Sequence, residues 1–257
     1  MRNFLNRNLI LLGILLSMIL LAGCQEDAKL TSDSLALYLP METGKYIIYR
    51  VDSTVFTQFG RQTETHSYLV KCQIDSSFAD NLGRNSYRIL RTIRDTLETT
   101  PWKNAGSFFV TPGVTQVEWI EDNLRQIKLQ YPIHTTTTWK GNRYLSSNPL
   151  NPPYDFSNDD NMPDWNFEYA GSPASVQYRD QLYNEVITIK QIDRSFNVPI
   201  TLPGSYAFKN FAIDRFAKNI GLVYKEWECW EYQPNTGGSG GPYRIGFGIR
   251  QWMVAHN

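Results

Sequence analysis

The stretch 46-YIIYRVDSTVF-56 has the alternation of a β-strand that lies half in a core. Ile47, Tyr49 and Val51 fall on one face, whereas Arg50 falls on the other. Successive side chains of a strand point to opposite faces, so this period of two residues predicts one apolar face and one wet face.

The segments that follow repeat this pattern. In 65-THSYLVKCQID-75 the apolar face consists of Tyr68, Val70, Cys72 and Ile74. A third alternating run covers 86–94, and 116-QVEWIEDNLRQIKLQ-130 reads as a hairpin with its turn at 121–123. Consecutive amphipathic strands joined by short turns predict an antiparallel meander. Further strands are expected near 167–169, 185–193, 221–233 and 243–253.

One segment departs from the β pattern, because its apolar residues recur at helical spacing. These residues are Phe208, Phe211, Ala212 and Phe216. Ser205 provides an N-cap, and Asn219 and Gly221 provide stop signals. The spacing predicts a helix over residues 206–218 that lays its phenylalanine stripe on the sheet.

Together these elements predict a mainly β fold. We expect an antiparallel, strongly curved half-barrel or barrel-like sheet of about ten strands, with the helix near 206–218 covering one opening. A two-sheet β-sandwich is the alternative. An apolar share of 42% with 13 Phe, 15 Tyr and 7 Trp is ample for a packed core.

The first residues read as an export signal rather than as part of the fold. Arg2 and Arg7 precede an apolar run over 9–23, which then meets Cys24 and acidic residues. As a helix, those 15 residues would extend about 22 Å, short of a bilayer core of roughly 30 Å. A cleaved leader therefore explains the run better than a membrane span does.

The tetrapeptide Leu21-Ala22-Gly23-Cys24 resembles a bacterial lipobox. The resemblance implies that Cys24 becomes the acylated N-terminus of the mature chain, and more than one acyl chain suffices for stable membrane anchoring. We therefore expect a signal peptide over 1–23, a polar tether over 24–36 and a single β-rich domain over 37–257. The partner that this predicts is a membrane, held through the lipid on Cys24.

Charge and cysteine content narrow the function classes. The formal net charge is zero, which gives no basic face for nucleic acid, so no nucleic-acid partner is expected. Beside Cys24, only Cys72 and Cys229 remain. In an oxidising compartment these two could form a disulfide or be buried separately, and the sequence leaves both readings open.

No catalytic, metal or cofactor site is predicted. The letters GGSGG place Ser239 in a GxSxG pattern, but a proline and a strand follow it instead of a helix, and a flexible loop is the better reading. The three histidines, His66, His134 and His256, are far apart and lack partners at zinc-like spacing.

Aromatic density near the C-terminus is the least ordinary feature. Trp227, Trp230 and Tyr232 lie near the end of one strand, and Trp252 lies near the end of the last. They could face a ligand in an aromatic-lined pocket, or they could serve ordinary sheet packing.

The lipobox, the opening segment YLPMETGKYIIYRVDS and the segment FAKNIGLVYKEW together resemble a large group of Bacteroidota outer-membrane lipoproteins. The resemblance implies a lipid-anchored protein of the outer membrane, facing the periplasm or the outside, and transfers no catalytic residue. We expect a non-enzymatic binding or scaffold role with a protein or glycan partner. The alternative is a carrier of a lipid or other apolar ligand in a β-cup, and a less favoured one is an envelope hydrolase.

Overall fold

One antiparallel sheet dominates the computed structural model. The described residues are 32–151, 154–178, 180–235, 237 and 240–257. The expected leader, Cys24 and Ser239 lie outside them.

The described residues build a sheet of 13 strands. The N-terminal strands are β1 (Tyr46–Thr57), β2 (Gln62–Ala79), β3 (Asn85–Asp95), β4 (Lys103–Pro112), β5 (Gln116–Glu121), β6 (Leu124–Gln130) and β7 (Thr138–Trp139). The C-terminal strands are β8 (Phe167–Tyr169), β9 (Ala174–Tyr178), β10 (Gln181–Phe196), β11 (Ala207–Ala217), β12 (Gly221–Gln233) and β13 (Tyr243–His256). Two short helical turns accompany them, α2 (Leu35–Tyr38) and the 3-10 helix η1 (Met162–Asp164).

The strand order is that of two meanders joined at their first and last strands. It runs β6-β5-β4-β3-β2-β1-β13-β12-β11-β10-β8-β7, with β9 paired to β10 outside this path. Strands β1 and β13 pair antiparallel from Ile47 opposite His256 to Thr54 opposite Gly248. This pairing therefore unites the two halves of the described chain in one sheet.

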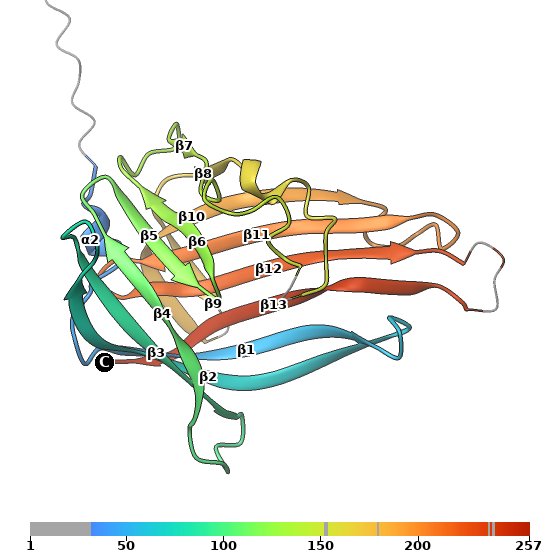
Figure 1. Ribbon diagram of the computed structural model, residues 1–257, viewed down its shortest axis with the longest axis horizontal. Helices are drawn as coiled ribbons and strands as arrows, with labels where there is room; N and C mark the ends of the chain where they lie inside the picture. Colours follow the sequence, from blue (N-terminus) through green and yellow to red (C-terminus); the bar gives the residue numbers. More distant parts are fainter. Residues whose placement is uncertain (1–31, 152–153, 179, 236, 238–239) are drawn as a thin grey trace, which may run out of the picture. The chain divides into compact units, whose positions relative to one another are not determined.

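The two ends of this order approach each other, so the sheet is nearly closed. The Ile127 backbone N–H on β6 donates to the Gly141 carbonyl just beyond β7 at 2.7 Å, and the Trp139 indole donates to the Ile127 carbonyl at 2.8 Å. Figure 1 shows β4, β5 and β6 turning over the long strands β11 and β12. The prediction of a strongly curved antiparallel sheet is confirmed, with 13 strands among the described residues instead of about ten, and with one sheet instead of a sandwich.

The predicted apolar faces of the first strands point into the curve. Ile47, Tyr49 and Val51 on β1 line the interior together with Val70 and Ile74 on β2. The largest fully buried side chains include Tyr38, Phe156, Phe167 and Phe216. Since complete burial of a large apolar side chain contributes about 1.5–3 kcal/mol, this interior is the main source of stability.

The helix predicted over 206–218 is wrong, because that segment is strand β11. It lies in the middle of the sheet between β10 and β12 and is covered on both faces, with Phe216 in the main core and Ile213 in a separate cluster with Tyr224. A strand buried on both faces loses its two-residue alternation, and its apolar residues then fall by chance at helical spacing. The predicted stop signals form the turn into β12, where Asn219 and Gly221 have φ of 64° and 118°.

The first described residues are held against this sheet. Leu35 and Tyr38 of α2 are buried, and the Asn219 backbone N–H donates to the Leu37 carbonyl at 2.6 Å. Among the described residues, no helix is both long enough and apolar enough to span a bilayer.

Candidate functional site

A cavity of about 380 Å³ lies inside the curved sheet. Its lining comes from inward side chains of β1 to β6 and of β11 to β13, with further residues from the segment 39–45 and the loop at 154. Ligand cavities usually measure about 300–1,000 Å³, so this one is of the size that holds a small molecule.

Most of the cavity wall is apolar. The apolar residues that line it include Leu39, Ile47, Val51, Val70, Ile74, Ile89, Ile93, Phe108, Val110, Phe216, Leu222, Trp227 and Ile249. They follow from the two-residue period of their strands, which places every second side chain inside. This wall can bury the hydrocarbon part of a ligand.

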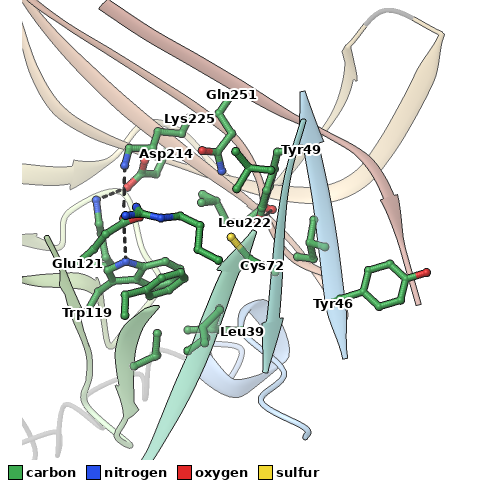
Figure 2. A pocket seen from close by; sticks show the side chains of 18 of the residues that line it. Leu39, Tyr46, Tyr49, Cys72, Trp119, Glu121, Asp214, Leu222, Lys225 and Gln251 are labelled. Atoms are coloured by element: carbon green, nitrogen blue, oxygen red, sulfur yellow. Dashed lines mark hydrogen bonds and ion pairs between the residues drawn. The ribbon is translucent and has the colours of Figure 1, made fainter. Parts of the chain in front are cut away.

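Polar side chains gather in one part of the cavity. Figure 2 shows Glu121, Asp214 and Lys225 gathered in one part of the view, with Leu39 away from them. The cavity is therefore amphipathic.

The tight turn between β5 and β6 positions the first acidic groups. Asp122 and Asn123 have positive φ of 48° and 65°, which suits a two-residue hairpin turn. The turn brings Glu121 and Asp122 to Arg91 on β3, at 2.9 and 2.8 Å. The second oxygen of Glu121 accepts from the Trp119 indole at 3.2 Å.

A buried ion pair joins β6 to β11 across the interior. Lys128 Nζ lies 2.8 Å from Asp214 Oδ2, and their side chains are only 7% and 2% exposed. The Gln191 amide also donates to Oδ2 at 2.8 Å, whereas Oδ1 is buried and has no hydrogen-bond partner among the described residues. Burial lowers the pKa of Lys128, and the adjacent Asp214 carboxylate opposes this shift.

Lys225 on β12 completes the polar group. Its nearest carboxylate oxygen is Glu121 Oε2 at 3.8 Å, and its ammonium lies 5.6 Å from the ring centroid of Trp227. Burial alone would lower the pKa of Lys225, but the Glu121 and Asp214 carboxylates outweigh it and raise the pKa above its ordinary value. Lys225 is therefore a stable cation inside the cavity.

Cys72 and Cys229 are both free thiols in the structure, so the bridge that the sequence allowed is not formed. In the strand register, Cys72 on β2 lies opposite Ile47 on β1, which lies opposite His256 on β13. Cys229 on β12 lies opposite Phe247 on β13. These two levels on β13 are nine residues apart, which at about 3.3 Å per residue separates the thiols by roughly 30 Å along the strands. Burial raises the pKa of Cys72, which lines the cavity, to about 12, so it is a poor nucleophile.

The four aromatic residues that the sequence singled out do not share one pocket. Trp227 lines the cavity and meets Phe247 edge to face at 4.9 Å between centroids. Trp230 donates to Glu228 at 3.2 Å, Tyr232 donates to the Pro203 carbonyl at 2.8 Å, and Trp252 packs against Tyr178 at 5.1 Å. None of these three lines the cavity. On β12 the lining side chains include Leu222, Lys225 and Trp227, and on β13 the neighbour of Trp252, Gln251, lines it instead.

Sequence reasoning missed the ionic group and Tyr154. Tyr154 stacks on Phe247 at 3.9 Å from a long irregular loop and lines the cavity. The loop carried no periodic signal, but Arg91, Asp214 and Lys225 did, since each is a charge among apolar residues that line the cavity from the same strand. Within the described part of the chain, no group of three or more His, Cys, Asp or Glu is arranged to hold a metal ion.

The geometry defines a class: an antiparallel β-sheet curved around an amphipathic cavity. No family model matches the chain, and neither does any curated protein.

Solved structures similar to this chain include a Bacteroides fragilis protein with a YmcC-like fold, described as a candidate exported protein. It has 10% identity, a TM-score of 0.35, and coverage of 84% of this chain and 96% of that one. A candidate outer-membrane lipoprotein-sorting domain from Vibrio parahaemolyticus has 10% identity, a TM-score of 0.20, and coverage of 83% and 85%. A DUF1329 family protein from Desulfovibrio piger has 10% identity, a TM-score of 0.18, and coverage of 88% and 93%. Values this low assign neither a family nor a function to the chain.

Proposed function

We propose that this protein is a lipid-anchored component of the cell envelope that binds a small amphipathic molecule inside its curved sheet. The observation that carries the proposal is the cavity of about 380 Å³, whose wall is mostly apolar and which holds an ionic group in one part. An apolar pocket with a few convergent polar groups is the usual form of a small-molecule site.

The chemistry of the lining supports binding rather than covalent catalysis. The one cysteine among the described lining residues is Cys72, whose pKa is raised by burial. The carboxylates Glu121 and Asp214 already accept hydrogen bonds from Trp119, Lys128 and Gln191. Carboxylates engaged in this way are poorly placed to exchange protons with a ligand.

The envelope location rests on the N-terminal sequence. The lipobox-like residues before Cys24 support acylation at that cysteine. Growth with a labelled fatty acid tests this: the native chain should incorporate the label and sediment with membranes, and Cys24→Ser should abolish the incorporation. Equal incorporation by both chains would refute the anchor and leave the cavity proposal standing.

Photo-labelling of the full chain in isolated envelopes tests binding. The probe is an alkyl diazirine with a terminal alkyne and no polar head group, and peptide mass spectrometry maps the labelled residues. We expect labels on the inward residues of β1 to β3, such as Val51, Val70 and Ile93.

A variant that fills the cavity provides the comparison. Ile93→Trp puts a large ring at a half-buried lining position of β3 and should strongly reduce the internal labelling. Leu90→Trp makes a matched change on the same strand, at a side chain that is 38% exposed and does not line the cavity, and should leave the labelling intact. Labels confined to outward residues, or an equal effect of both variants, would refute the proposal.

A further inference from the structure

The polar part of the cavity contains groups whose hydrogen bonds are complete and groups whose hydrogen bonds are not. Each nitrogen of Arg91 is engaged, since Nε donates to the Ala105 carbonyl and the terminal nitrogens donate to Glu121 and Asp122. Glu121 uses one oxygen for Arg91 and the other for Trp119. These residues hold one another in place and have little hydrogen-bonding capacity left for a ligand.

Lys225 and Asp214 in the same part retain unused hydrogen-bonding capacity. The Lys225 ammonium has no hydrogen bond to a described residue, and the 3.8 Å to Glu121 Oε2 is too long for one. Asp214 Oδ1 is a buried acceptor without a partner among the described residues, on a residue that is 1% exposed and lines the cavity. An unsatisfied buried acceptor costs about 1–3 kcal/mol, so a bound donor would relieve it. Lys225 and Asp214 thus offer one donor group and one acceptor, and the Gln251 amide, opposite Lys225 on β13, also lines this part of the cavity.

The charges of this part are balanced. The cations are Arg91, Lys128 and Lys225, and the carboxylates are Glu121, Asp122 and Asp214. Lys45, another charged residue of the described lining, is paired with Glu42 at 3.2 Å. A head group with a net charge would add an uncompensated charge to a largely buried site, and such a charge is strongly unfavourable. An uncharged head group avoids this cost.

We propose that the cavity binds an uncharged single-chain amphiphile whose hydroxylated head group accepts a hydrogen bond from Lys225 and donates one to Asp214 Oδ1. This inference rests on the proposed function and names the ligand class of that same cavity. A hydroxyl is both donor and acceptor, so a head group of one or two hydroxyls matches both unused groups. The apolar wall, with Leu39, Ile47 and Ile74, takes the hydrocarbon chain.

Competition in isolated envelopes that contain the full chain tests the head group. The reporter is the uncharged alkyl diazirine, and its labelling of inward residues is measured. The competitors share one chain length: 1-monohexadecanoylglycerol, hexadecanoate and hexadecylamine. We expect the glycerol ester to compete at a concentration roughly tenfold lower than either charged compound does. A tenfold difference in affinity is about what one buried hydrogen bond contributes.

Charge-altering variants provide the sharper readout. Because each competitor is compared with itself across variants, its partitioning into envelope lipid cancels. Lys225→Met leaves the polar part with one excess negative charge. The ratio of the hexadecanoate to the hexadecylamine concentration needed for competition should therefore rise roughly tenfold over that of the native chain. Glu121→Gln leaves one excess positive charge and should favour hexadecanoate by a similar factor.

Lys209→Met is the matched control. Lys209 is on β11, pairs with Glu228 at 3.0 Å and does not line the cavity, so this variant should leave all three competitors unchanged. Continued labelling by the reporter shows that each variant retains its fold.

The outcomes separate the two proposals. A native chain that prefers hexadecanoate or hexadecylamine, or charge variants that leave the order unchanged, would overturn the inference while binding itself stands. A reporter that labels no inward residue of the native chain would overturn the proposed function and the inference with it.

Discussion

The substitution Asp214→Asn tests the ion pair that links β6 to β11. Asparagine keeps the size of the side chain but removes the charge that faces Lys128 Nζ at 2.8 Å. With both side chains at most 7% exposed, the remaining lysine would be a buried cation without a counter-charge. Breaking a buried pair in this way costs about 3–5 kcal/mol. For a chain of this size, that corresponds to a fall in melting temperature of roughly 6 to 20 °C.

The loss should depend on pH in a defined direction. Burial lowers the pKa of Lys128 below the ordinary 10.5, and Asp214 is the group that most opposes this, so the variant lowers it further. Between the folded and unfolded pKa values the unfolded state binds more protons, and stability therefore rises with pH in that window. The stability contribution of neutral Lys128 is present above 10.5 and is lost as pH falls through the lowered pKa. The deficit of Asp214→Asn should consequently be smaller at pH 9.5 than at pH 7.

Pulse proteolysis of the full chain in urea, carried out in envelope suspensions, measures the folded fraction. Glu168→Gln is the matched control, because it breaks the pair between Lys190 and Glu168, whose side chains are 41% and 39% exposed. An exposed pair contributes at most about 1 kcal/mol. The double variant Lys128→Met with Asp214→Leu should recover much of the loss, since apolar residues often replace a buried pair without penalty. If Asp214→Asn cost no more than Glu168→Gln, or its cost did not change with pH, the reasoning would be refuted.

Two further predictions concern the backbone and the thiols. Gly246→Ala should destabilise by at least about 2 kcal/mol in the same urea assay, because Gly246 has φ of 105° and a Cβ would lie 2.1 Å from the Cys229 carbonyl oxygen. Gly204→Ala, where a Cβ meets nothing within 4 Å, should be nearly neutral, and equal effects would contradict this. At pH 8 iodoacetamide should modify neither Cys72 nor Cys229 before unfolding and both afterwards, since burial raises the pKa of each thiol. Without reductant, a tryptic peptide mass with the two joined would contradict the free thiols.

The alternation of apolar residues predicted the strands that build the cavity wall. In β1 and β2 one face points inward, so the period of two residues survives in the sequence and identifies residues such as Ile47 and Val70. The hairpin of β5 and β6 was also predictable, because its polar turn stands between two apolar runs. The prediction failed at β11, where burial on both faces removes the period that distinguishes strand from helix.

The sequence predicted a barrel-like sheet but not which side chains meet across it. Lys128 and Asp214 are 86 residues apart, and they meet because β6 turns over β11 and not because their strands are hydrogen-bonded. A local pattern records the face on which a side chain lies, whereas contact across a closed sheet depends on the curvature of every strand between.

The charges inside the cavity did leave a local trace, and it carries the functional argument. Arg91 stands between Ile89 and Ile93 on one inward face, and all three line the cavity. Lys225 likewise shares its inward face with Trp227. A charge kept on an apolar face costs stability unless something pairs with it, and Arg91 is fully paired by Glu121 and Asp122. Lys225 is held less closely, with Glu121 Oε2 at 3.8 Å and no hydrogen bond to a described residue, and Asp214 Oδ1 has no hydrogen-bond partner among the described residues. Apolar side chains at these two points would avoid the cost of unsatisfied polar atoms. The unused hydrogen-bonding capacity beside an apolar wall is therefore best explained by a ligand that completes it.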